Sequence, residues 1–557
     1  MSDSHLTPFD SNAYTSKLDD PAAWHGKIEG RPLPLSSGNS EEDFKLATKW
    51  LQGCLQNHAT CSKPNQETTL PTRVIDVGPS NGSTEPYILH SNGRRGLYIA
   101  LSHSWGGYVS LTTTVGTLHE RARSIPCESL PKTFREAVIV TRQLGIRYLW
   151  IDSLCIVQDS KDDWEKESAV MGDIYALSFL TIAARGAENS TGGLFIEREP
   201  EPSSCCLKYE CAEHSLSGFM YVRSPAFQLE RLRDTPLDTR GWVLQERLLS
   251  PRILCYGRHQ LYWECGESAF RQDGKAADVT NDGLRHGFNF KQDLSFNGPL
   301  LFSNNPVFLR DYQPSDFPQF ETRARLLQWY NVVTEYTSRH LTYQSDKLPA
   351  ISGVAKAFRK ITGYTYLAGI WKEDLIAGIA WRVATPSNDL ISPILPSWTW
   401  ARLKGEIRFW GQRPGLPLAM IDGSCELIQV AHNLAGGHNP YGDIRDAELR
   451  IRGRLIEVTY RASQKPVDEF PSTIFSTNGV PIGRIHFDLQ SSTLQNTHTL
   501  FCILINNDNT HSAALALESV AEPWTTKYRR IGYVAISSNV ESRTEFTKVL
   551  PRVIEII

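Results

Sequence analysis

Four residues at the ends of two apolar segments are of types that can form a nucleophilic site. Ser102 and His103 close the first segment, and Asp152 and Cys155 lie at the end of the second. A serine or cysteine activated by a histidine, with an aspartate orienting the imidazole, recurs in nucleophilic catalysis. We therefore hypothesise a nucleophile at Cys155 or Ser102; the alternative interpretation of Cys155 is a small buried hydrophobic residue. Metal-assisted hydrolysis through His103, Asp152 and Asp159 is a further hypothesis, although their spacing matches no standard metal site.

A second group with the chemistry of metal ligands lies nearer the N-terminus. Cys54, His58 and Cys61 are spaced closely enough to bind zinc, but no second pair of ligands lies at a suitable spacing nearby. We interpret them as a helix end packed with small buried thiols. The sequence has neither a Gly-x-Gly-x-x-Gly motif nor a Walker loop, so no standard dinucleotide or triphosphate cradle is expected. We accordingly expect no cofactor and no metal.

The elements that position the first group are predicted to be strands of one sheet. Apolar runs predict buried strands, and amphipathic spacing predicts helices between them. A strand, a crossover helix and a strand imply parallel pairing with a right-handed connection. The expected fold is a small doubly wound, mostly parallel α/β sheet, in which ligands bind beyond the carboxyl ends of the strands. The strands are expected at 70–77, 96–102, 147–152 and 178–184, and the helices at 41–58, at 131–144 and from 160 onward.

A third segment, Arg240–Pro251 (RGWVLQERLLSP), alternates charge around apolar residues and predicts a short helix. A tryptophan flanked by arginines can stack on them or form a cation–π contact. A buried Glu246 needs a partner, which Arg240 or Arg247 can provide. One interpretation is a structural latch against the sheet. The other is that Gln245 or Glu246 faces the same crevice as Asp152, with Trp242 closing over it.

The composition restricts the class of protein. The chain has 557 residues, 41% of them hydrophobic, which is enough for two or three globular domains. With 58 basic and 61 acidic residues, the formal net charge of -3 gives no electrostatic case for binding nucleic acid or an anionic membrane. The sequence contains no uninterrupted apolar stretch of about 18 residues, so we expect no membrane span. Residues 1–20 lack the basic-then-apolar pattern of a secretion signal. Eleven scattered cysteines fit a reduced setting, so we expect a cytoplasmic protein.

The pattern along the chain also predicts a domain organisation. Short strands separated by turns dominate the last third of the sequence, which predicts a β-rich domain there. The expected parts are a flexible arm at 1–40, an α/β domain at 41–270, a polar insertion at 271–318, a helical connecting region at 319–380 and the β-rich domain at 381–557.

Three phrases, in this order, resemble the HET domain of the fungal heterokaryon incompatibility family. They are YIALSHSWG at 98–106, YLWIDSLCIVQDSKDD at 148–163 and RGWVLQERLLSP at 240–251. Each phrase alone is weak, but the three in order are specific. With flanking phrases at 70–76, 346–353, 366–371 and 396–400, the resemblance covers about residues 45–405. Two positions depart from the commonest pattern of the family, because His103 replaces the usual Tyr and Val157 replaces Asp or Asn.

The resemblance implies a role in non-self recognition and programmed cell death. A distant similarity of this family to TIR domains has been proposed, and some TIR domains hydrolyse NAD. By that analogy, Glu167 would be the carboxylate that stabilises an oxocarbenium-like transition state, with Asp152 and Asp159 in reserve; the alternative is that Glu167 lies on a solvated helix face. The residues expected to contact the ligand are Trp105, Gly106, Gln158, Asp159, Arg240, Trp242, Gln245, Glu246 and Arg247.

Three functions therefore remain open from the sequence. The first is a HET-type effector that acts by self-association or by turning over a small molecule or nucleotide. The second is a biosynthetic enzyme, of cyclase or hydrolase type, that has reused this scaffold; the atypical His103 and Val157 favour it slightly. The third is an interaction module that recognises a protein partner without catalysis.

Overall fold

The computed structural model of the chain divides into two compact units, residues 1–283 and 284–557, each described here by itself. The residues that it describes are 14–15, 21, 38–59, 61, 68–106, 111–197, 205–211, 216–222, 235–274, 317–387, 389–392, 394–410, 422–434, 439–442, 444–461, 472–490, 500–507, 512–520 and 526–557. The arm expected at 1–40 and the insertion expected at 271–318 lie largely outside this set. Within the arm, β1 (Tyr14–Thr15) pairs with β10 (Leu216–Val222), which in turn pairs with β9 (Cys205–Cys211).

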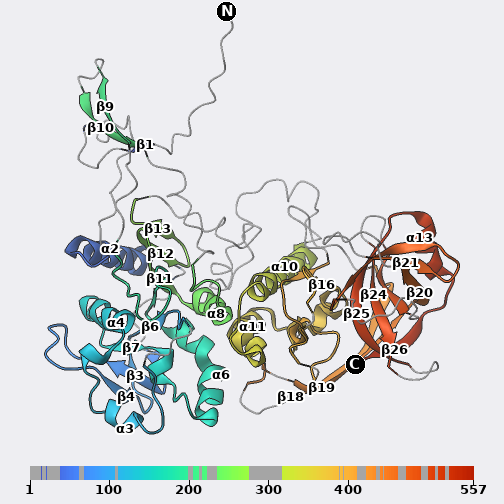
Figure 1. The fold of residues 1–557 in the computed structure, drawn as a ribbon, viewed down its shortest axis with the longest axis horizontal. Coiled ribbons are helices and arrows are strands. Elements are labelled where there is room, and N and C mark those ends of the chain that lie inside the picture. The colour runs from blue at the N-terminus through green and yellow to red at the C-terminus, as the bar shows by residue number, and fades with distance from the viewer. Residues whose placement is uncertain are drawn as a thin grey trace, which may run out of the picture. The chain divides into compact units, whose positions relative to one another are not determined.

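The first unit is built on an eight-stranded mixed sheet (Figure 1). Its strand order is β13-β12-β11-β8-β6-β7-β3-β4. The strands β11, β8, β6 and β7 in the centre are parallel, whereas the pairs on either side of them are antiparallel. The expected α/β class is therefore present, but the sheet is mixed and larger than expected, and the predicted parallel pairing holds only for its centre. The strands are β3 (Arg73–Asp76), β4 (Tyr87–His90), β6 (Tyr98–Ser102), β7 (Tyr148–Trp150), β8 (Leu180–Ala183), β11 (Arg252–Tyr256), β12 (Leu261–Cys265) and β13 (Ala269–Arg271).

The helices of this unit follow from the order of the parallel strands. The connection from β6 to β7 contains α4 (Lys132–Gln143), and the chain then crosses back over β6 to β8 through α6 (Lys161–Leu177). Right-handed connections in opposite directions place α4 and α6 on opposite faces of the sheet, as in a doubly wound fold. The helix α8 (Gly241–Leu249) connects β8 to β11 in the same direction as α6, and it packs against α6. The crevice between β6 and β8 is thus a topological switch point.

Local sequence signals account for the ends of these helices. Phe134, Ala137 and Val138 are buried along one face of α4, as their spacing predicts. Gly145, with φ of 71°, follows the helix in a left-handed conformation that lacks a Cβ penalty. Ser160 caps α6 by accepting a hydrogen bond from the backbone N–H of Asp163.

The second unit contains a nine-stranded sheet, six of whose strands close into a barrel (Figure 1). The strands β20 to β25 form the ring, because β24 also pairs with β25, and apolar side chains such as Val458, Cys502 and Val534 fill its interior. Strands β19 and β20 are consecutive in the chain and meet at Arg454. The strands are β18 (Cys425–Leu434), β19 (Ile444–Gly453), β20 (Leu455–Arg461), β21 (Ser472–Ser476), β22 (Pro481–Phe487), β23 (Leu500–Asn506), β24 (Ala513–Ser519), β25 (Lys527–Ile536) and β26 (Arg552–Ile556), with α13 (Val540–Thr547) before the last.

The segment expected to be helical at 319–380 belongs to this second unit. Its helices α10 (Phe317–Thr337) and α11 (Pro349–Thr362) pack on each other. Trp329 and Trp371 are both buried there, with ring centroids 5.1 Å apart. Arg530 of β25 is fully buried: its guanidinium lies 3.2 Å from the ring centroid of Trp381, and it pairs with Asp488 at 2.6 Å.

Candidate functional site

The carboxyl ends of β6 and β7 bring His103 and Asp152 together, as the sequence predicted. Asp152 opens the short helix α5 (Asp152–Cys155) directly after β7, and its Oδ1 lies 3.7 Å from Nδ1 of His103. Trp105 donates a hydrogen bond from its indole Nε1 to the other carboxylate oxygen of Asp152, at 3.0 Å. At 3.7 Å the imidazole and the carboxylate are beyond hydrogen-bond length, so the indole N–H is the closer partner of Asp152.

His103 is held as a neutral imidazole. Its side chain is 3% exposed, and its ring contacts the edge of Phe134 with centroids 4.9 Å apart. Burial lowers the pKa of His103 to about 4, against the opposing effect of Asp152. Arg240 donates a hydrogen bond to the carbonyl oxygen of His103, which fixes the start of α8 against the end of β6. A neutral imidazole can accept a proton only weakly here.

Glu246 of α8 is the most perturbed carboxyl group of this region. It is 2% exposed, and burial raises its pKa to about 7, while the charge of Arg240 acts in the opposite direction. The hydroxyls of Ser102 and Tyr175 contact the carboxyl group, and that of Tyr175 also donates to the carbonyl oxygen of Leu101 at 3.1 Å. Its Oε2 atom has no hydrogen-bond partner among the described residues. A carboxyl group with this pKa can exchange a proton near neutral pH.

A pocket adjoins Glu246 at the switch point between β6 and β8. Its empty space measures about 300 Å³ with open solvent included, but the enclosed cavity is only about 10 Å³, room for roughly one water molecule. Strands β6, β8 and β11 supply one wall and α8 supplies the other, which is where an open α/β sheet binds ligands. The residues that line it are Ser102, Thr181, Ala183, Arg185, Leu237, Asp238, Val243, Glu246, Arg247, Ile253, Cys255 and Glu264.

Two ion pairs, one buried and one partly buried, form the charged part of the pocket lining. Arg185, which follows β8, pairs with Asp238 at 2.8 Å, and both side chains are 4% exposed or less. Arg247 pairs with Glu264 at 3.0 Å. Arg247 is therefore not the partner of Glu246 that the sequence suggested. Because the arginines are matched by carboxylates, the lining carries little net charge apart from Glu246 itself.

Cys155 and Glu167 lie away from the pocket lining. Cys155 is fully buried, which raises the pKa of its thiol to about 12 and disfavours the nucleophilic thiolate. Its carbonyl oxygen accepts a hydrogen bond from Arg73 at 2.6 Å, and Arg73 also lies 3.7 Å from Glu167 and 2.5 Å from Asp163. Glu167 is 4% exposed, so it does not lie on a solvated helix face. This environment favours structural interpretations of both residues.

The predicted ligand contacts of the second phrase instead stabilise its loop. Gln158 donates from Nε2 to the carbonyl oxygen of Asp152 at 3.2 Å, and Asp159 accepts from the backbone N–H of Val115 at 2.8 Å. Both residues shape the chain after Asp152, and neither lines the pocket.

The remaining predicted contacts lie on the loop after β6 and on α8. Gly106 has φ of 63°, and a Cβ there would lie 2.2 Å from the Cβ of Asn189. Trp242 is half-buried against the core of the first unit. Gln245 is fully buried but does not line the pocket, whereas Val243, Glu246 and Arg247 of the third phrase do.

The sequence interpretation missed Tyr175 and Arg185 as members of the site. Tyr175 was not among the predicted site residues, and its hydroxyl reaches Glu246 because α6 packs against α8. Arg185 follows the third parallel strand, so the rule that located Ser102 and Asp152 could have located it as well.

Residues 98–246 match the family of heterokaryon incompatibility proteins (HET). The chain carries a HET domain. The match begins at the first residue of β6 and ends at Glu246, so it contains His103 and Asp152 as well as Ser102 and Glu246 of the pocket lining. It is shorter than the 45–405 expected from the sequence phrases. No curated protein and no solved structure gave a significant match to the chain.

Among the described residues, no helix combines the length and the apolar character that a bilayer crossing requires.

Proposed function

We propose that this HET-domain protein takes part in heterokaryon incompatibility by acting as an enzyme on a small molecule. The observation that carries the proposal is Glu246. A buried carboxyl group with one unpartnered oxygen and a pKa of about 7, beside a pocket, is costly unless the group is used. Its position at a topological switch point is where an α/β sheet binds ligands.

The reaction class that this arrangement supports best is N-glycosidic cleavage of a nucleotide such as NAD. The bond between ribose C1′ and the base nitrogen breaks, and its electron pair stays on the neutral leaving base. Ionised Glu246 stabilises the oxocarbenium-like sugar and then takes a proton from the attacking water, whose oxygen bonds to C1′. Ser102 and Tyr175 hold the carboxyl group in place through their hydroxyls. This role replaces the one that the TIR analogy would give to Glu167.

The size of the pocket restricts how such a substrate would bind. As it stands, the enclosed cavity of about 10 Å³ has room for roughly one water molecule. A base and its ribose would therefore enter only after the side chains that line the pocket move apart. Mononucleosides need less room than a dinucleotide, so they are worth including in any activity screen.

The direct test is release of nicotinamide from NAD by the purified full-length chain. The Glu246→Gln variant is expected to lose about 100-fold or more of the rate, the usual size of a general acid–base contribution. Glu167→Gln is the matched control, because it changes an equally buried glutamate that does not line the pocket. Absence of turnover by the wild type would overturn NAD hydrolysis, and equal losses in both variants would overturn the role of Glu246.

The alternatives have their own readouts. Turnover of a metabolite other than a nucleotide in an unbiased screen would support the biosynthetic alternative. Expression in a fungal host separates the enzyme from the interaction module. Growth arrest by the wild type but not by Glu246→Gln supports catalysis, whereas arrest by both supports a partner-binding role.

A further inference from the structure

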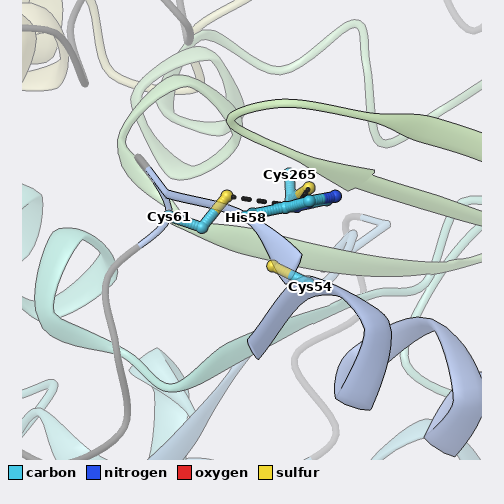
Figure 2. Close-up of side chains that lie close together, drawn as sticks. All are labelled: Cys54, His58, Cys61 and Cys265. Carbon is cyan, nitrogen blue, oxygen red and sulfur yellow. Dashed lines mark hydrogen bonds between the residues drawn. The ribbon is translucent and has the colours of Figure 1, made fainter. Parts of the chain in front are cut away.

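Four potential metal ligands converge in the first unit on the side of the sheet where α2 (Glu41–Asn57) packs against β12 (Figure 2). Cys54, His58 and Cys61 come from the C-terminal end of α2 and the residues after it, and Cys265 is the last residue of β12. The three sulfur atoms and one imidazole nitrogen all lie within 4.8 Å of one another. His58 Nδ1 is 3.3 Å from the sulfur of Cys265 and 3.6 Å from that of Cys61.

These distances suit a tetrahedral zinc ion. With zinc–sulfur bonds of about 2.3 Å, the ligand atoms of a tetrahedral site lie about 3.8 Å apart. The cluster needs only small side-chain adjustments to reach that geometry. Structural zinc sites take four cysteine or histidine ligands, and the Cys-x3-His-x2-Cys spacing places three of them around one helix end.

We propose that Cys54, His58, Cys61 and Cys265 bind one zinc ion as a structural site of the HET-domain unit. The sequence interpretation stopped at three ligands, because the fourth is more than two hundred residues away (265 − 61 = 204). The four protein ligands complete the coordination of zinc and leave no position for a substrate, which makes the site structural rather than catalytic.

The surroundings of the cluster match the charge that the site would carry. Three thiolates, a neutral imidazole and Zn²⁺ sum to one negative charge. Arg252, which is buried on β11, donates from Nε to the sulfur of Cys54 at 3.3 Å. The hydroxyl oxygen of Ser268 lies 3.3 Å from the sulfur of Cys265. Such outer contacts orient ligands and offset excess charge around a metal.

A disulfide explains the cluster less well. Cys54, Cys61 and Cys265 are all free thiols. One disulfide would use two of them and leave the third cysteine and His58 without a role. Simple packing of thiols does not explain the convergence of an imidazole with three sulfur atoms from two distant segments.

The proposed zinc would connect two segments outside the matched HET region. It joins α2 to β12, and β12 pairs with β11, which together with Glu264 forms part of the pocket wall. The metal would thus hold in place the edge of the sheet on which the pocket depends. The proposal does not rest on catalysis, and metal content reports on it even if the enzyme hypothesis fails.

The test is elemental analysis of the full-length chain purified under reducing conditions from a zinc-supplemented culture. One zinc per chain is expected, and replacement by Co²⁺ is expected to give the visible absorption of a tetrahedral thiolate site. A wild-type chain without stoichiometric metal that also fails to bind Co²⁺ would overturn the proposal. A disulfide between any two of the three cysteines in the native protein, detected by mass spectrometry, would do so too.

Variants assign the ligands. Cys265→Ser is expected to lose the metal, whereas Cys255→Ser, which removes an equally buried thiol from the adjacent strand β11, is expected to keep it. If Cys265→Ser does not fold, His58→Cys provides the second measurement: four thiolates still bind zinc, so this variant should keep one metal per chain. Equal metal content in Cys265→Ser and Cys255→Ser would contradict the assignment.

Discussion

Burial shifts the two key titratable residues of the site in opposite directions. The pKa of His103 falls to about 4 and that of Glu246 rises to about 7, and in each case the largest cause is the cost of burying the charged form. Both groups are therefore largely neutral in the fold at mildly acidic pH. Glu246 is the one of the two that changes its charge near pH 7, which makes it the stronger candidate for proton transfer.

The raised pKa of Glu246 predicts how its replacement affects stability. Between about pH 4.5 and 7, the Glu246 carboxyl group loses its proton in the unfolded chain but keeps it in the folded one. The free energy of unfolding of the wild type therefore falls as the pH rises, and Glu246 contributes up to about 1.4 kcal/mol per pH unit to that fall. Glu246→Gln removes that dependence. The stability difference, variant minus wild type, should rise through this window in chemical denaturation, and a constant difference would contradict the prediction. The opposite contribution of His103 is common to both proteins and cancels in the difference.

The buried pair of Arg185 and Asp238 gives a second prediction. Arg185→Met leaves Asp238 buried without its cation and should lower the free energy of unfolding by about 3–5 kcal/mol. The double variant Arg185→Met, Asp238→Leu removes both charges and should recover much of this loss. Urea denaturation measures both, and a double variant no more stable than the single one would count against the pair as the cause.

Residue types at strand ends predicted part of the site. Ser102, His103 and Asp152 were expected at one sheet edge, and parallel pairing of β6 with β7 brings the last two together. Their catalytic roles stay predictions. Glu246 was expected either in a latch or in the crevice, but its perturbed pKa could not be anticipated because burial depends on how α8 packs. The fourth cysteine of the metal cluster was missed for a similar reason, since chain separation hides spatial proximity.

At the level of elements, continuous apolar runs predicted the central strands well. The segments containing β6, β7 and β8 are buried on both faces, and a buried strand leaves a strong signal of this kind. The edge strand β4 was missed, because it is partly exposed and short. The direction of β3 relative to its neighbour could not be predicted either, because the same apolar run fits a parallel or an antiparallel strand. In the structure β3 is antiparallel to β7.

The loop after β6 gives a prediction at this scale. Gly106→Ala should be clearly more destabilising than Gly145→Ala, although both glycines have positive φ. A Cβ at Gly106 would lie 2.2 Å from Asn189 Cβ and 2.9 Å from the carbonyl oxygen of Glu188, whereas a Cβ at Gly145 meets nothing within 4 Å. The control variant Gly145→Ala should lower the free energy of unfolding by about 1 kcal/mol through backbone strain. Gly106→Ala should lower it by about 1–3 kcal/mol more. Thermal denaturation measures the difference in stability between the two variants. Equal losses of stability would contradict the prediction, because they would mean that the loop after β6 rearranges at no cost to accommodate the new Cβ.

At the scale of the whole molecule, the two units are different kinds of fold. The β-rich C-terminal region was predicted from its short alternating strands. The closure of strands β20 to β25 into a barrel was not predicted. It depends on the pairing of β24 with β25, which no local sequence pattern specifies. The helices α10 and α11 were expected in a separate connecting region, but they belong to the second unit.

The division into two units predicts two thermal transitions for the intact chain. Arg530→Met removes a buried cation that pairs with Asp488 and stacks on Trp381, so it should lower the transition of the second unit by several degrees. Gly106→Ala should lower only the transition of the first unit. Differential scanning calorimetry separates them, and a single transition that moves with both substitutions would show that the units unfold as one.

The residues that line the pocket are far apart in the sequence, which has a consequence for the synthesis of the protein. Ser102 and Glu246 are 144 residues apart (246 − 102), and β11, which forms the next wall, comes later still. At about 5–20 residues per second, a ribosome needs roughly 7–29 s to pass from one to the other. Nascent chains and early-terminated products therefore lack the pocket altogether, and whatever activity it has begins only once translation has moved beyond β11.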